Sequence, residues 1–127
     1  MKIRILGNKL RLRLVQQEIR DLTEGRPVVE SVDFPVGDQL QYAVEPAADL
    51  SEVTAAFEGG KISVKVPVAL LEGWEMDDRV GIYHEADTDE RTFSIAVEKD
   101  FKCLHKRPGE DESDNYPHPM VGREVRE

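Results

Sequence analysis

Two stretches of this 127-residue chain repeat one order of apolar residues at a spacing of 52 positions, without a gap. In the first stretch, three leucines alternate with basic residues over Leu10–Leu14. Alternation of this kind is typical of a β-strand with one buried face. The matched pairs are Gly7 and Gly59, Leu10 and Ile62, Leu12 and Val64, Leu14 and Val66, Ile19 and Leu71, Leu22 and Trp74, and Val28 and Val80. Alternation alone matches short strands at some offset, but here the helical positions match too, which favours an internal duplication.

Each repeat predicts the same order of elements. In the first, strands over 1–6 and Leu10–Leu14 are joined by a Gly7-Asn8 turn, a short helix follows over Gln16–Thr23, and Gly25 with Pro27 ends it. A hairpin comes next. We therefore predict an all-β fold of about eight strands with short helices, in one domain over residues 1–100 with halves 1–46 and 52–98. The predicted core comprises Leu12, Leu14, Ile19, Leu22, Val64, Val66, Leu71, Trp74, Val80 and Ile82.

The charge and composition of the chain restrict the classes of protein to which it can belong. The net charge is -9, which works against uniform binding to nucleic acid or to an anionic membrane. No apolar run approaches the roughly 18 residues of a membrane span. Cys103 is the only cysteine, so no internal disulfide can form, and no basic-then-apolar leader opens the chain. These features predict a cytoplasmic protein that does not associate with membranes.

The order of elements resembles a known family. A Gly-Asn turn at Gly7-Asn8, an alternating strand with Arg13 near its end, Val66-Pro67 in the second half, and the Asp-Asp-Arg-Val run 77–80 before a hairpin are similar to the swapped-hairpin domain of AbrB, SpoVT and MazE-like proteins. In those families two chains interlace to close one β-barrel. The resemblance implies a single-chain, pseudo-two-fold barrel that is monomeric or weakly dimeric. Val15 replaces a family Pro, and Glu58-Gly59-Gly60 replaces the basic Gly-Asn turn.

The chain also resembles, over nearly its full length, a small family of short bacterial proteins of unknown function. The residues that carry this likeness are Arg4-Ile5-Leu6-Gly7-Asn8 at the start and the run 98–104 before a Pro-rich end. That family has no known activity, so this resemblance implies none for the chain.

Basic residues gather near the N-terminus: the first 26 positions hold seven Lys or Arg and three Asp or Glu. Alternation predicts that the cations share one outward face. The candidate contacts with a partner or with nucleic acid are Arg4, Asn8, Lys9, Arg11 and Arg13. In the resembled families this face reads DNA, through phosphate contacts that need several cations together. A solvated face paired with acids of the same chain is the alternative, because Ser63 stands in the second half where Arg11 stands in the first.

The C-terminal stretch 101–127 is polar, acidic and Pro-containing, and it has too few large apolar groups for a core of its own. We predict that it is a partner-binding tail, with candidate contacts Glu110, Asp111, Glu112, Asp114 and Tyr116. Its residues 108–115 are expected to be exposed, and Tyr116 is expected to return to the body as an anchor. Cys103, His105 and His118 are weak candidates for a zinc site, since they lack paired ligand spacing, and packing is the other interpretation of Cys103.

No catalytic motif stands out in the sequence. The carboxylates of the run 87–90 are typical of a solvated turn, and no nucleophile elbow or phosphate-binding glycine loop is present. We therefore expect a non-enzymatic binding or regulatory module without a cofactor, whose partner is an unidentified protein. DNA binding through the basic N-terminal face is the alternative.

Overall fold

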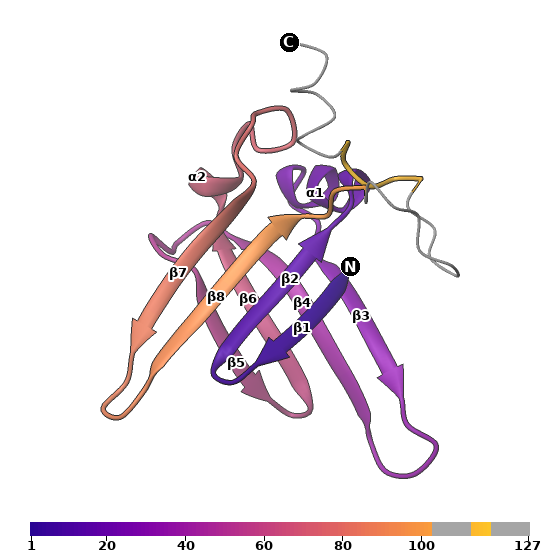
Figure 1. The fold of residues 1–127 in the computed structure, drawn as a ribbon, viewed down its shortest axis with the longest axis vertical. Coiled ribbons are helices and arrows are strands. Elements are labelled where there is room, and N and C mark those ends of the chain that lie inside the picture. The colour runs from indigo at the N-terminus through magenta and orange to yellow at the C-terminus, as the bar shows by residue number, and fades with distance from the viewer. Residues whose placement is uncertain (103–112, 118–127) are drawn as a thin grey trace.

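The computed structural model describes residues 1–102 and 113–117, and it is mostly β. Eight strands and two short helices follow one another along the chain (Figure 1). They are β1 (Lys2–Leu6), β2 (Lys9–Leu14), α1 (Gln16–Thr23), β3 (Val28–Asp33), β4 (Gln39–Ala47), β5 (Thr54–Glu58), β6 (Lys61–Pro67), α2 (Val68–Leu71), β7 (Gly81–Asp87) and β8 (Thr92–Lys99). The predicted helix over Gln16–Thr23 and the mostly β class are confirmed.

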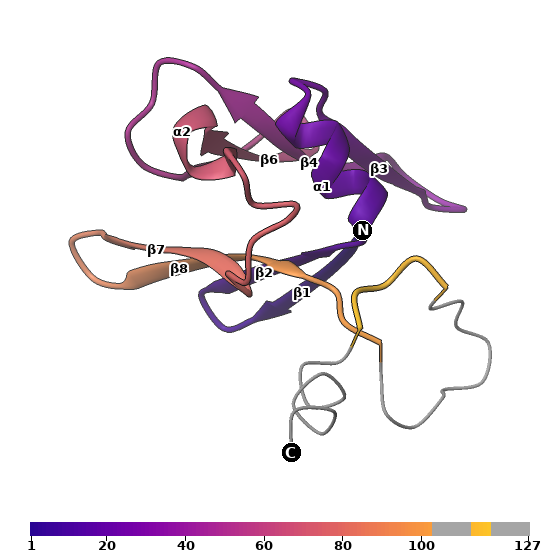
Figure 2. The same cartoon turned by 90° about the horizontal axis from the view of Figure 1, so that it is seen from above.

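The strands form two four-stranded sheets with the orders β1-β2-β8-β7, here called sheet A, and β3-β4-β6-β5, here called sheet B. In both, a central parallel pair is flanked by antiparallel partners: β2 runs parallel to β8, and β4 to β6. Each sheet therefore combines one hairpin from the N-terminal half with one from the C-terminal half. Seen from above, the two sheets are stacked as two layers (Figure 2).

The two sheets do not join into the predicted closed barrel. Closure requires a ladder that continues around every strand, whereas each sheet ends in two edge strands, β1 and β7 in sheet A and β3 and β5 in sheet B. The strand ends also spread apart with distance from α1 (Figure 1). The arrangement is two packed sheets with open edges.

Glycine sets the two tight turns that join β1 to β2 and β5 to β6. Gly7 has φ 58° and Asn8 does not share the positive φ, which is typical of a type II′ turn. Gly59 and Gly60 have φ 58° and 74°, as a type I′ turn requires. The two connections are thus equally short but differ in backbone conformation.

The core lies between the sheets at the end covered by the helices. Of the predicted core residues, Leu12, Leu14, Ile19, Leu22, Val64, Val66, Leu71, Trp74 and Ile82 are buried. The predicted burial of Val80 is wrong, because this residue is 45% exposed. It lies just before β7, and Ile82 pairs with Val97 in sheet A as Val28 pairs with Val44 in sheet B. The gapless spacing of 52 therefore does not continue into β7.

Residues 113–117 lie against the body of the protein. Phe101 and Tyr116 form a parallel β-bridge, and their rings are 5.8 Å apart. Tyr116 is 8% exposed and Asn115 2%. The expected return of Tyr116 to the body is therefore observed, but the expected exposure of Asn115 is wrong, because the segment packs beside the end of β8.

Candidate functional site: a cationic groove on sheet A

The basic residues of the N-terminal hairpin meet on the outer face of sheet A. In the β1–β2 ladder Lys2 lies opposite Arg13, and Arg4 opposite Arg11. Leu10, Leu12 and Leu14 are buried, and side chains alternate between the faces of a strand. Lys9, Arg11 and Arg13 therefore point outward, as the sequence predicted for these cations.

Part of this charge is neutralised by β8. Glu98 Oε1 lies 3.0 Å from Arg11 Nε and 3.8 Å from Arg13 Nε. The Tyr83 hydroxyl donates to Glu98 Oε2 at 2.8 Å. Burial, followed by this hydrogen bond, raises the pKa of Tyr83 to about 12. One carboxylate thus interacts with two arginines and a tyrosine.

A groove of about 360 Å³ crosses the four strands of sheet A on this face. Its floor includes Ser94 and Ala96 of β8, two small side chains. Arg4, Lys9 and Arg11 stand on one side, and the other side holds Tyr83, His84 and Glu85. The hollow forms because short side chains in the middle of the sheet lie between long ones on its neighbours. Three cations and one carboxylate line it, so the groove favours an anionic ligand.

Arg4 and Lys9 are the cations best placed for such a ligand. Within residues 1–102 and 113–117, neither side chain forms a hydrogen bond or an ion pair. Asn8, another predicted contact, has a structural role instead. Its Nδ2 donates a hydrogen bond to the Thr92 carbonyl at 3.1 Å, which ties the β1–β2 turn to the start of β8. The groove therefore holds two cations whose side chains have no partner among the described residues, beside a turn that Asn8 ties to β8.

Sheet B has no matching cluster among the described residues. Ser63 of β6 stands between Lys61 and Lys65, and Lys61 Nζ pairs with Glu45 at 3.3 Å. Within the described residues the cationic surface belongs to sheet A, as the presence of Ser63 in the second half where Arg11 stands in the first indicated.

The predicted tail contacts divide into two groups. Glu110, Asp111 and Glu112, together with the weak zinc candidates Cys103, His105 and His118, lie outside the described residues. Asp114 is described and caps α1: its carbonyl accepts from the Gln16 amide at 3.2 Å, and its Oδ2 accepts from the Gln17 amide at 3.3 Å. Tyr116 is buried, so its ring is not presented to a partner in this conformation.

Sequence reasoning missed Tyr83 and His84, which line the groove, and Glu98, which pairs with Arg11 and Arg13. Alternation along β7 and β8 places Tyr83 and Glu98 on outward faces, but nothing local indicates that β8 pairs with β2. Elsewhere in the described part of the chain, no group of three His, Cys, Asp or Glu side chains could hold a metal ion. No described helix is long and apolar enough to cross a membrane.

The fold and the groove define a mostly β protein of two small sheets with a one-sided cationic surface. The chain belongs to a family of unknown function, DUF7009, whose model matches residues 1–120. Neither a search of curated proteins nor one of solved structures gave a match. The expected membership of an uncharacterised family is confirmed in this form, and these comparisons do not show the resemblance to AbrB-like proteins.

Proposed function

We propose that this protein is a non-enzymatic binding module whose partner is a protein that presents an acidic segment to the groove of sheet A. The observation that carries the proposal is the pair Arg4 and Lys9, two cations without an ion-pair partner among the described residues, on the rim of a hollow. Carboxylates of a partner would supply the missing charges. Tyr83 adds an aromatic wall, and aromatic residues are enriched at protein interfaces.

The groove favours a peptide over a DNA duplex. Contacts with several phosphates need several free cations along one backbone, and Glu98 already occupies Arg11 and Arg13. Glu85 would face the same phosphates, and the net charge of the chain is -9. A short acidic segment needs only the two unpaired cations.

We also propose that the two halves arose by duplication of a swapped-hairpin unit, so that one chain supplies what two chains supply in AbrB-like proteins. The equal strand orders of the two sheets and the apolar spacing along 7–74 support this. The protein would then act as a monomer in the cytoplasm. The mode of binding does not depend on this origin.

The test is fluorescence anisotropy with a labelled hexaglutamate peptide and, separately, a labelled random DNA duplex. Arg4→Ala/Lys9→Ala should weaken the peptide about tenfold, because each exposed pair contributes up to about 1 kcal/mol. Lys65→Ala, an exposed cation on sheet B, is the matched control and should leave binding unchanged. Tighter binding of the duplex that is lost in Arg11→Ala/Arg13→Ala would replace the proposal with DNA binding.

A further inference from the structure

Glu98 lies at one end of the outer groove of sheet A. In β8, Ile95 and Val97 are buried, and side chains alternate between the faces of a strand. Ser94, Ala96 and Glu98 therefore face outward. Ser94 and Ala96 line the groove, and Glu98 is the next outward residue along β8. The small floor of the groove is thus followed directly by a carboxylate.

Both oxygens of the Glu98 carboxylate have partners. Oε1 lies 3.0 Å from Arg11 Nε and 3.8 Å from Arg13 Nε, and Oε2 accepts from the Tyr83 hydroxyl at 2.8 Å. The Glu98 side chain is 13% exposed, whereas each arginine side chain is 41% exposed. Fully exposed ion pairs contribute little, because water and salt screen them. The cover over this carboxylate reduces the screening, so an anion in solution competes poorly for the two arginines.

Gly81 provides the space that this arrangement needs. It lies opposite Glu98 in the β7–β8 ladder. A Cβ atom at position 81 would come within 2.8 Å of Glu98 Cγ and 2.8 Å of the Tyr83 hydroxyl oxygen. Nonbonded carbon atoms prefer a separation of about 3.5–4.0 Å, so a larger residue would push both side chains aside. The position of the carboxylate therefore depends on the glycine beside it.

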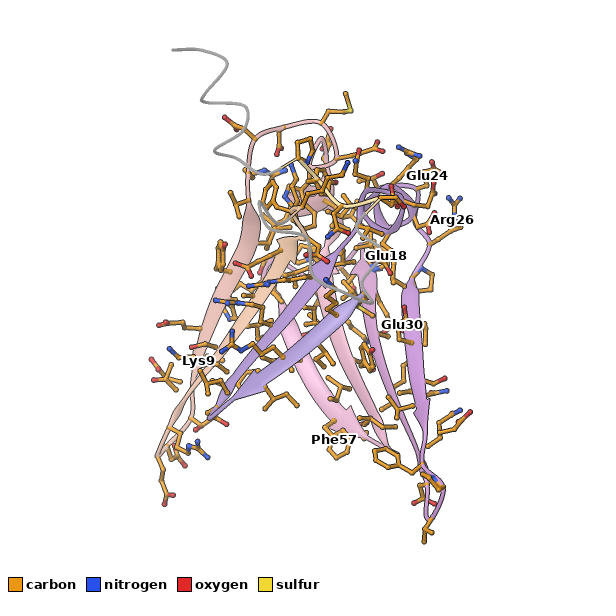
Figure 3. The ribbon with its side chains drawn as sticks, turned by 45° about the vertical axis from the view of Figure 1, so that its right-hand side comes forward. Lys9, Glu18, Glu24, Arg26, Glu30 and Phe57 are labelled. Atoms are coloured by element: carbon orange, nitrogen blue, oxygen red, sulfur yellow. The ribbon has the colours of Figure 1, made fainter. Side chains whose placement is uncertain are left out.

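Four cations of the N-terminal hairpin differ in their availability to a ligand. Arg11 and Arg13 are paired with Glu98. The side chains of Arg4 and Lys9 have no partner among the described residues. Figure 3 shows Lys9 on the side of sheet A that faces away from sheet B. Release of the two arginines would double the number of available cations on this face, and contacts with several phosphates need several cations together.

We propose that Glu98 determines the specificity of the groove, because its pairing with Arg11 and Arg13 excludes nucleic acid and other polyanions. Only Arg4 and Lys9 then remain for a ligand, which restricts the groove to short segments that carry carboxylates. This inference rests on the proposed function for the ligand that is accepted, and it adds the residue by which polyanions are rejected.

The experiment is fluorescence anisotropy of the full chain with a labelled random DNA duplex over a range of salt concentrations. Glu98→Gln keeps the size of the side chain and removes its charge, and it should bind the duplex at least tenfold more tightly than the wild type. The logarithmic dependence of its affinity on salt should be steeper by about 1.8, as expected for about two further phosphate contacts.

Glu85→Gln is the matched control. Glu85 also lines the groove, and within the described residues it forms no ion pair. Its replacement changes the net charge by the same amount as Glu98→Gln but releases no arginine, so the affinity for the duplex should change by less than about threefold. Gly81→Ala is a second test, because it retains Glu98 and displaces it. This variant should also bind the duplex more tightly than the wild type. Wild-type emission from Trp74 verifies that each variant is folded.

Titration of the same proteins with labelled hexaglutamate separates this inference from the proposed function. If the wild type binds hexaglutamate and Glu98→Gln gains no affinity for the duplex, the role of Glu98 alone is overturned. An equal gain in Glu85→Gln would also overturn it, since charge rather than release of the arginines would then be the cause. A gain confined to Glu98→Gln and Gly81→Ala would support the role of Glu98, even if the wild type did not bind hexaglutamate and the proposed function failed.

Discussion

Replacement of Trp74 by alanine tests how the helical end of the sandwich is held together. Trp74 is the largest fully buried side chain, with no exposed surface. Its Nε1 donates to the Arg79 carbonyl at 2.9 Å, and its backbone amide donates to the Leu71 carbonyl at 3.0 Å. The indole thus fills the core and also fixes the loop that leads from α2 to β7.

The expected loss follows from these two contributions. Truncation of a buried aromatic side chain to alanine costs about 3–5 kcal/mol, including the cavity that remains. The Arg79 carbonyl also loses its donor. A domain of this size is stable by roughly 5–15 kcal/mol, so the variant should lose about a fifth or more of its free energy of unfolding. The melting temperature should fall by about 10–20 °C.

Urea unfolding followed by circular dichroism measures the loss, since the variant has no tryptophan to report by fluorescence. In the wild type, Trp74 emission should be shifted to the blue of free tryptophan. Met76→Ala is the matched control in the same loop: Met76 is 87% exposed, and its replacement should change stability by less than about 0.5 kcal/mol. A loss below about 1 kcal/mol in Trp74→Ala, or emission at the wavelength of free tryptophan, would refute the packing described here.

Three further predictions concern pH, the loop before β7, and association. Burial raises the pKa of Tyr116 to about 12, and that of Tyr83 is raised to about 12 as well. Stability from these groups is complete below the unfolded pKa near 10 and should be lost as the pH rises from 10 to 12. Lys99 has the opposite effect, because burial lowers its pKa. Its contribution to stability rises with pH until the unfolded pKa of about 10.5 is reached, and it does not change above that pH. The Tyr116 hydroxyl is buried without a hydrogen-bond partner in the described structure. Tyr116→Phe should therefore stabilise the protein by about 1 kcal/mol and reduce the stability that is lost between pH 10 and pH 12. A lower free energy of unfolding of this variant in urea would contradict the prediction. Arg79 donates to the Leu70 and Glu72 carbonyls at 2.9 and 3.2 Å. Arg79→Met should therefore lower the free energy of unfolding in urea by about 1–3 kcal/mol. An unchanged free energy of unfolding would mean that Trp74 alone holds the loop. Light scattering at micromolar concentration should give the mass of a monomer or a weak dimer, and a dimer that persists on dilution would contradict the proposal that one chain completes the fold.

Local patterns in the sequence determined the elements and most of the core. The alternation over Leu10–Leu14 fixed which side chains of β2 are buried, because a strand has a period of two. The helix over Gln16–Thr23 followed from Ile19 and Leu22 three apart and from Gly25 beyond, and all three positions behave as predicted. The cations of the N-terminal hairpin were placed on one face for the same reason. Each of these inferences depends on neighbours within a few residues.

The tertiary structure alone decided how distant segments meet. The parallel pairing of β2 with β8 brings Glu98 beside Arg11 and puts the small floor of the groove, Ser94 and Ala96, between the long side chains. Pairing across more than 80 residues has no local signature in one sequence, because any alternating strand can join any other. The exposure of Val80 depends in the same way on where β7 begins. The open end between the sheets arises from how two whole layers pack and diverge, which no stretch of the sequence specifies by itself.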